Sequence, residues 1–400
     1  MTLLSTIDRI SDSRLLERIA SARAIMTDAG VNVLMIYAHP RGLGGGGPLH
    51  YLAGWTPKGA GTILLLPLEG RGIILSAGPN NTRVYNLRCA FFADTRAYGP
   101  NAPFARLLAD GLAELGASGG KIGVSGTPYM PAPLRASLDE LVGEQVFLGD
   151  ALDALRLVRH ADEVAMHQRA ADISVGMIER VMDLARLPAT TPSDLMIEAE
   201  LTGRKLEADA ASIWLATGER PPTTYFELFE LNKTIGPKDR VQLGATVSYE
   251  GHFGQCLRTG VRGGISTAMQ DAWDRMVEMQ DLALATLVPG APMQGLVDRL
   301  EADIDALCPY TRANDPFRFQ SCHALGVNYS DPSYVQAVNP ERDRSKDGDL
   351  PLVAENMIFE IHPNFTLPEL GHVCIGDMAL VTATGAKWIT NHPRELVRLD

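Results

Sequence analysis

The stretch Val241-Gln-Leu-Gly-Ala-Thr-Val-Ser-Tyr-Glu-Gly-His-Phe-Gly-Gln-Cys-Leu-Arg-Thr259 decides the fold of this chain. Its pattern predicts a β-hairpin. Because side chains alternate between the two faces of a strand, His252 and Gln255 are expected on opposite faces. Gly244 has no side chain and Gln255 carries a neutral amide, so neither offers the charged carboxylate that a hard divalent cation prefers.

The composition limits the classes of protein to consider. A chain of 400 residues exceeds one ordinary core, so two domains are expected. Its formal net charge of -12 argues against binding to a nucleic-acid backbone, which needs a basic face. The 5 cysteines are scattered, which favours reduced thiols, and neither a signal peptide nor a membrane-spanning run is recognisable. A cytoplasmic protein is expected, with no nucleic-acid or membrane partner.

Helix and strand patterns alternate up to about residue 150, as in an α/β domain. The predicted helix at 14–29 ends at Gly30. The glycine-rich run Arg41–Pro48 lacks a phosphate-loop pattern and shows no helix pattern after it, so a flexible loop is predicted there. The strands predicted in this half cover 31–37, 62–67 and 72–76.

A second domain is expected to begin near residue 155, which gives domains of 1–155 and 156–400. A long helix is predicted to open at Leu155, and Thr191-Pro-Ser-Asp marks the start of another. A further helix is predicted at 266–288. Strand patterns surround Cys322-His323, Met357–His362 and Val373–Thr382.

Several segments together carry a resemblance to a known family. They are the hairpin, His50-Tyr-Leu-Ala-Gly-Trp55, the helix from Leu155 to Asp172, Ser321-Cys-His-Ala-Leu-Gly326, Glu360-Ile-His-Pro363 and His372-Val-Cys-Ile-Gly-Asp-Met-Ala-Leu-Val-Thr382. The whole chain resembles the creatinase, prolidase and methionine aminopeptidase family. This resemblance implies an α/β fold of the α+β kind, in which a creatinase-like N-terminal domain precedes a C-terminal pita-bread domain.

Metal-dependent members of that family bind two metal ions through two aspartates, one histidine and two glutamates. The matching positions here are Gly244, Gln255, His323, His362 and Gly376. Every carboxylate is replaced, so the sequence predicts no metal and no other cofactor. Two alternatives stay open: a single zinc ion on His323, His362 and a cysteine, or a register shift that brings Glu360 into place.

The resemblance implies a metal-independent mechanism, because creatinase works without metal through the histidine of this motif. His323 is the predicted general acid and base, with His362 beside it, and the alternative, an ordinary core histidine, is the less favoured one. The predicted substrate-binding residues are Tyr225, Glu227, Gln255, Arg258, Glu360 and Trp55. Glu227 could instead be a solvated loop carboxylate, and Arg258 a structural ion-pair partner.

The predicted function is hydrolysis of a non-peptide C–N bond in a small molecule of the amide, ureide or amidine type. Creatine itself is not expected, since Leu257 and His362 replace two glutamates of creatinase. The protein is therefore predicted not to be a metallopeptidase. The alternatives are a small-molecule lyase and a non-catalytic pita-bread protein that binds a peptide or a protein partner. The resemblance also implies a homodimer.

Overall fold

The computed structural model describes residues 8–39, 46–57, 59, 61–89, 92, 94–225, 227–307, 321–331 and 351–400. The chain divides into two compact units. The first contains Met1–Leu157 and Gly326–Pro332, and the second contains Val158–Leu325 and Ser333–Asp400. The return of the chain to the first unit after Leu325 was not predicted from the sequence.

The first unit is built on one six-stranded sheet in the order β4-β3-β2-β1-β5-β6. Its strands are β1 (Val33–Ala38), β2 (Thr62–Pro67), β3 (Ile73–Ala77), β4 (Asp94–Tyr98), β5 (Lys121–Ser125) and β6 (Glu144–Phe147). Its helices are α1 (Asp12–Asp28), α2 (Gly47–Ala53), α3 (Gly78–Arg88), α4 (Phe104–Glu114), the short 3₁₀ helix at Thr127–Tyr129, α5 (Ala132–Leu141) and α6 (Gly149–Leu155). Strand β1 is antiparallel to β2 and parallel to β5.

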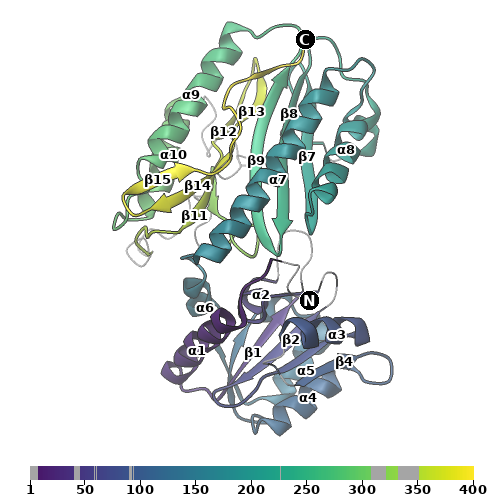
Figure 1. Ribbon diagram of the computed structural model, residues 1–400, viewed down its shortest axis with the longest axis vertical. Coiled ribbons are helices and arrows are strands. Elements are labelled where there is room, and N and C mark those ends of the chain that lie inside the picture. The colour runs from purple at the N-terminus through teal and green to yellow at the C-terminus, as the bar shows by residue number, and fades with distance from the viewer. Residues whose placement is uncertain are drawn as a thin grey trace. The chain divides into compact units, whose positions relative to one another are not determined.

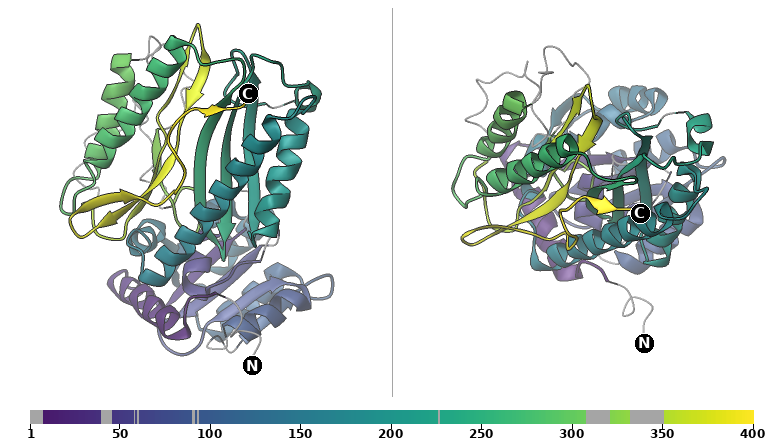
Figure 2. Two further views of the ribbon diagram at one scale, coloured as in Figure 1. Left: turned by 45° about the horizontal axis from the view of Figure 1, so that its top comes forward. Right: turned by 90° about the horizontal axis from the view of Figure 1, so that it is seen from above.

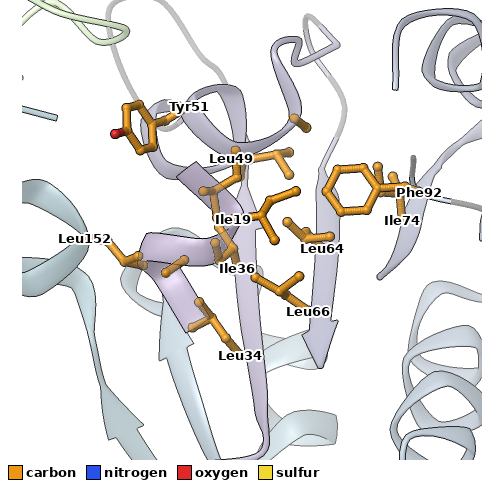
Figure 3. Close-up of a cluster of buried hydrophobic side chains, with 14 of the residues drawn as sticks. Ile19, Leu34, Ile36, Leu49, Tyr51, Leu64, Leu66, Ile74, Phe92 and Leu152 are labelled. Carbon is orange, nitrogen blue, oxygen red and sulfur yellow. The ribbon is translucent and has the colours of Figure 1, made fainter. Parts of the chain in front are cut away.

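Both faces of this sheet are covered, which explains why β1 is apolar at every position. Leu34 and Ile36 pack into the cluster that α1, α2 and α6 complete (Figure 3). Met35 and Tyr37 pack on the other face, with α4 and α5. A strand buried on both faces reads as a continuous hydrophobic run, as predicted for 31–37.

Two predictions for the first unit have different outcomes. Helix α1 ends at Asp28 and Gly30 adopts a left-handed φ of 63°, so the predicted stop is confirmed. The prediction of a loop through Pro48 with no helix after it is wrong. Helix α2 begins at Gly47, and Pro48 lies in its first turn, where a missing N–H costs nothing. Residues 40–45 of that run lie outside the described residues.

The hairpin of the second unit is confirmed. Strands β8 (Arg240–Tyr249) and β9 (His252–Val261) pair antiparallel, and Glu250 and Gly251 both have positive φ, as the tight hairpin turns require. With β7 (Ala210–Gly218) and β16 (Val397–Arg398) they form a sheet in the order β16-β9-β8-β7. Helices α7 (Ala161–Ala185) and α8 (Pro192–Lys205) lie against one face of this sheet (Figure 1).

The other face of the hairpin turns toward a second group of strands. They are β10 (Cys322–Ala324), β11 (Ile358–Ile361), β12 (Asn364–Leu367), β13 (Gly371–Cys374), β14 (Asp377–Thr382) and β15 (Gly385–Trp388). A β-bridge between Leu257 and Gly376 joins β9 to this group. Helices α9 (Thr267–Leu284) and α10 (Gln294–Leu307) lie side by side, on the far side of this group of strands (Figure 2). A short 3₁₀ helix covers Leu228–Asn232.

The long helix α7 does not start where it was predicted. Helix α6 ends at Leu155 and α7 begins at Ala161, because the Glu163 carboxylate accepts a 2.9 Å hydrogen bond from the His160 backbone and closes a capping box. The predicted start of α8 is confirmed, with Thr191 as its N-cap. No helix among the described ranges is long and apolar enough to cross a membrane.

Candidate active site

The candidate site lies on one face of the hairpin. Odd residues of β8, such as Val241 and Leu243, pack against α7 and α8. The even residues of β8 and the odd residues of β9 lie on the opposite face, which we call the inner face. It is formed by Arg240, Gln242, Gly244, Thr246, Gln255, Leu257 and Thr259. His252 instead lies on the α7 side, 3.8 Å from the Glu163 carboxylate, as the strand periodicity predicted.

The first glycine of the site is covered by an aromatic ring. Trp214 of β7 pairs directly with Gly244 of β8. A Cβ atom on Gly244 would lie 2.3 Å from the Cε2 atom of this indole. Trp214 therefore fills the space in which an aspartate side chain would begin. The sequence did not predict this contact, because only the pairing of β7 with β8 brings Trp214 to Gly244.

The second glycine is enclosed in the same way. A Cβ atom on Gly376 would lie 2.5 Å from Leu257 Cδ1 and 2.6 Å from Glu360 Oε1. The Glu360 carboxyl group is fully buried, and neither of its oxygens has a hydrogen-bond partner among the described residues. Burial, with a further contribution from the charge of Asp377, holds the pKa of Glu360 well above its ordinary value.

Two histidines lie beside Glu360. His323 of β10 pairs directly with Glu360, and the ring centroids of His323 and His362 are 5.2 Å apart in an edge-on arrangement. Burial and the neighbouring His323 lower the pKa of His362 well below its ordinary value. Nε2 of His362 is buried and has no hydrogen-bond partner among the described residues. His362 is therefore a neutral imidazole at physiological pH.

Gln255 of β9 joins these residues, because its backbone N–H donates to Met378 Sδ at 3.3 Å and Met378 pairs directly with Glu360. Gln255 is buried, it pairs with Thr246, and its Oε1 atom has no hydrogen-bond partner in the described parts of the chain. We call Gln255, His323, Glu360 and His362 the polar cluster. Buried polar atoms of this kind are costly unless something satisfies them, which marks the cluster as a place for a ligand.

The residues at the five positions do not fit the family's two-metal site. Two of them are glycines whose side-chain space is occupied by Trp214, Leu257 and Glu360. The others are an amide and two imidazoles, without a carboxylate to offset the dehydration of a divalent cation. No group of three or more His, Cys, Asp or Glu side chains in the described ranges could hold a metal ion.

Arg258 was predicted to bind substrate, and the structure places it within the protein. It is fully buried and forms a two-pronged ion pair with Asp377, with N–O distances of 2.7 and 3.1 Å. It also donates to the backbone carbonyl oxygens of Leu257, Gly376 and His392. Asp377 in turn accepts from Thr390 and Gln280. This matches the structural alternative for Arg258, and sequence reasoning did not include Asp377.

The remaining predicted residues are Tyr225, Glu227 and Trp55, and the structure shows only local contacts for them. The Tyr225 hydroxyl donates to the Thr217 carbonyl at 2.7 Å, along β7. Glu227 is exposed and precedes a short 3₁₀ helix. Trp55 belongs to the first unit, where it packs edge-on against Tyr85 at 4.9 Å. For these three residues, a role in substrate binding stays a prediction.

Comparisons with known proteins identify what the chain resembles. A family model described as Metallopeptidase family M24 matches residues 165–383. The chain is 24% identical to "Uncharacterized peptidase YqhT" of Bacillus subtilis, over 64% of this chain and 68% of that protein. It is 23% identical to "Xaa-Pro dipeptidase" of Pyrococcus furiosus, over 62% and 68% respectively. The crystal structure of dipeptidase PepE from Mycobacterium ulcerans matches 98% of this chain and 99% of that one, with a TM-score of 0.75 and 21% identity.

These findings confirm the predicted family and the two-domain pita-bread fold. They contradict the predicted function. The family is one of metallopeptidases and its similar members are named as peptidases and dipeptidases, so the expectation of a metal-independent, creatinase-like enzyme acting on a non-peptide C–N bond is wrong. The lyase and non-catalytic alternatives are not supported either.

Proposed function

The chain belongs to the metallopeptidase family M24, and on that premise we propose that it hydrolyses short peptides of the dipeptide class at the polar cluster. The relatives' names supply the substrate class. The observation that carries the proposal for this site is a pair of buried groups with opposite shifts: Glu360, whose pKa is raised, and His362, whose pKa is lowered. These shifts favour the protonated form of the acid and the unprotonated form of the base.

Such a pair can supply both proton transfers of peptide hydrolysis. His362 Nε2 takes a proton from water, and the water oxygen attacks the peptide carbonyl carbon. When the C–N bond breaks, the leaving nitrogen takes the Glu360 proton. Transfer of the proton from His362 to Glu360 then restores the starting state. Opposed pKa values in neighbouring groups are how one site performs acid and base chemistry at a single pH.

The other two members of the polar cluster assist this pair. His323, edge-on to His362, adds to the effect of burial in lowering the pKa of that imidazole, so His362 stays unprotonated at neutral pH. Gln255 Oε1 is an unsatisfied acceptor and receives an N–H group of the peptide. Both roles are those of positioning residues.

A panel of dipeptides, including Xaa-Pro peptides, tests the proposal with the purified protein. Each peptide is assayed without added metal, after chelation, and with added Mn²⁺, Co²⁺ or Zn²⁺. Glu360→Gln and His362→Gln are each expected to lower kcat/KM by about 100-fold or more. The matched control is Glu369→Gln, because Glu369 is exposed. If the wild type cleaves no peptide under any of these conditions, the proposed function is wrong.

Two further expectations belong to this proposal. Cys89, Cys256, Cys322 and Cys374 are free and buried, which supports a reducing, cytoplasmic location, whereas Cys308 lies outside the described residues. We also propose a homodimer, on the basis of the resemblance alone. Sedimentation velocity would test the oligomer, and a monomer at micromolar concentration would contradict it.

A further inference from the structure

Trp214 lies on the same side of the sheet as the inner face, because it pairs directly with Gly244. Its strand, β7, stands at the edge of this sheet. The Trp214 side chain is partly exposed, and Ser212, two residues earlier on the same side of the strand, is exposed. The residues of the polar cluster, by contrast, are buried. The inner face is therefore open to solvent at its β7 edge and closed around the polar cluster.

A row of apolar groups leads from this open edge to the polar cluster. Gly244 pairs with Trp214 on one side and with Leu257 on the other, and the indole covers the space above the glycine. Leu257 in turn forms a β-bridge with Gly376. A Cβ atom on Gly376 would lie 2.5 Å from Leu257 Cδ1 and 2.6 Å from Glu360 Oε1. We call Trp214 and Leu257 the apolar wall, and its inner end lies next to the Glu360 carboxyl group.

The apolar wall lies within reach of a dipeptide bound at the polar cluster. Neighbouring strands are about 4.8 Å apart, so the indole above Gly244 is roughly 10 Å from Gly376, two strand spacings away. Successive Cα atoms of a peptide are about 3.8 Å apart, and a side chain of the size of leucine extends several ångströms further. When the peptide bond lies at Glu360 and His362, a side chain of the same dipeptide therefore reaches the wall.

The chemistry of the wall determines which side chains it accepts. An aspartate at the position of Gly244 would make this place anionic, whereas an indole and a leucine side chain make it apolar. An apolar side chain gains free energy when it leaves water for such a surface. A charged side chain would lose hydration there, and neither residue of the wall offers a counter-charge. The broad face of the indole also suits a second ring in an offset-stacked or edge-on arrangement.

We propose that Trp214 is a specificity-determining residue, which together with Leu257 binds an apolar or aromatic side chain of the dipeptide substrate. This inference rests on the proposed function. Trp214 takes no part in the proton transfers, which belong to Glu360 and His362. Its role is to select substrates: dipeptides with a leucine or phenylalanine side chain at the wall bind more tightly than dipeptides with a hydrogen atom or a carboxylate there.

Equilibrium binding tests this without turnover. The probes are glycyl-glycine, leucyl-glycine and glycyl-leucine, each with its peptide bond reduced to a methylene amine, and binding is measured by calorimetry. The wild type is expected to bind one of the leucyl probes about 10-fold or more tightly than the glycyl-glycine probe. Trp214→Ala is expected to remove most of that preference. The matched control is Trp388→Ala, at another partly exposed tryptophan, which stacks with Arg394 and should keep the preference.

Two outcomes overturn the proposal: a wild type that binds neither leucyl probe more tightly than the glycyl-glycine probe, and a leucyl preference that survives in Trp214→Ala. If Trp214→Ala is insoluble, Trp214→Phe and Trp214→Gln are compared in its place, and only the phenylalanine variant should keep the preference. A leucyl preference in a wild type that cleaves no peptide would leave this subsite standing and remove only the proposed function. Cleavage of dipeptides without any side-chain preference would remove only the subsite.

Discussion

Gly244→Ala tests whether the indole of Trp214 fills the first carboxylate position. The added Cβ would lie 2.3 to 2.5 Å from three indole atoms, so the ring or the strand must move. Overpacking of this kind costs about 1–3 kcal/mol. A glycine-to-alanine change in an unstrained strand would otherwise stabilise by about 0.4–1 kcal/mol, and the φ of Gly244 is not positive. A net loss of about 1–2 kcal/mol is expected.

The effect should change sign when the ring is removed. In a Trp214→Val background the contact is absent, so Gly244→Ala is expected to stabilise by about 0.4–1 kcal/mol. The coupling energy of the two changes is then about 1–3 kcal/mol, which lies within the range measured for residues in direct contact. Gly385, at the start of β15, is the matched control, since nothing lies within 4 Å of its Cβ position.

The assay is urea unfolding followed by circular dichroism, with midpoints compared at equal m-values. Gly385→Ala is expected to leave the midpoint unchanged or to raise it slightly. A neutral or stabilising Gly244→Ala in the wild-type background would refute the reasoning, because the indole could not then cover the glycine. A cost that persists after Trp214→Val would also refute it, because another group would then fill that space.

Three further predictions concern buried charge. Asp377→Asn leaves Arg258 without its counter-charge and should cost about 3–5 kcal/mol in urea unfolding, whereas Asp139→Asn, in an exposed pair, should cost under about 1 kcal/mol. The pKa of His372 falls from 6.5 to about 4 on folding, so the unfolded chain binds the proton first as the pH is lowered. About 3 kcal/mol of the stability present above pH 6.5 should therefore be lost on acidification to about pH 4. The variant His372→Gln should not show this loss. Because folding raises the pKa of Glu360, the unfolded chain loses that proton first as pH rises above 4.5, so stability should fall with rising pH and Glu360→Gln should remove that slope.

Local patterns predicted the elements that hold the site. Alternation along 241–259 predicted the hairpin, and its parity correctly placed His252 and Gln255 on opposite faces. The N-cap signal at Thr191 predicted the start of α8. These features depend on neighbours in sequence, which explains their accuracy. The predicted start of α7 at Leu155 is wrong because the capping signal of this helix, His160 with Glu163, lies five residues further along the chain.

Contacts between residues far apart in the chain could not be predicted from the sequence. Arg258 meets Asp377 and Gly244 meets Trp214 only after the sheets have formed. The predicted reaction failed for a different reason. It was inferred from the loss of carboxylates at Gly244, Gln255, His362 and Gly376. Such a loss shows which metal ligands are missing, but it does not determine which substrate is bound. The proposed peptide substrate rests instead on the names of similar proteins, which are peptidases and dipeptidases.

The polar groups of the inner face lower the free energy of unfolding. Glu360, His362, Gln255 and Gln242 each keep buried polar atoms without partners among the described residues, and Arg240 keeps a buried charge. Each of these groups destabilises the folded chain, and an apolar side chain of similar size would not. Arg240, Gln242 and Gln255 lie on the inner face of the hairpin, and Glu360 and His362 lie on and just after β11. A ligand that satisfies these groups would recover that free energy on binding, which supports the proposal of a short peptide, with its alternating donors and acceptors, as the substrate.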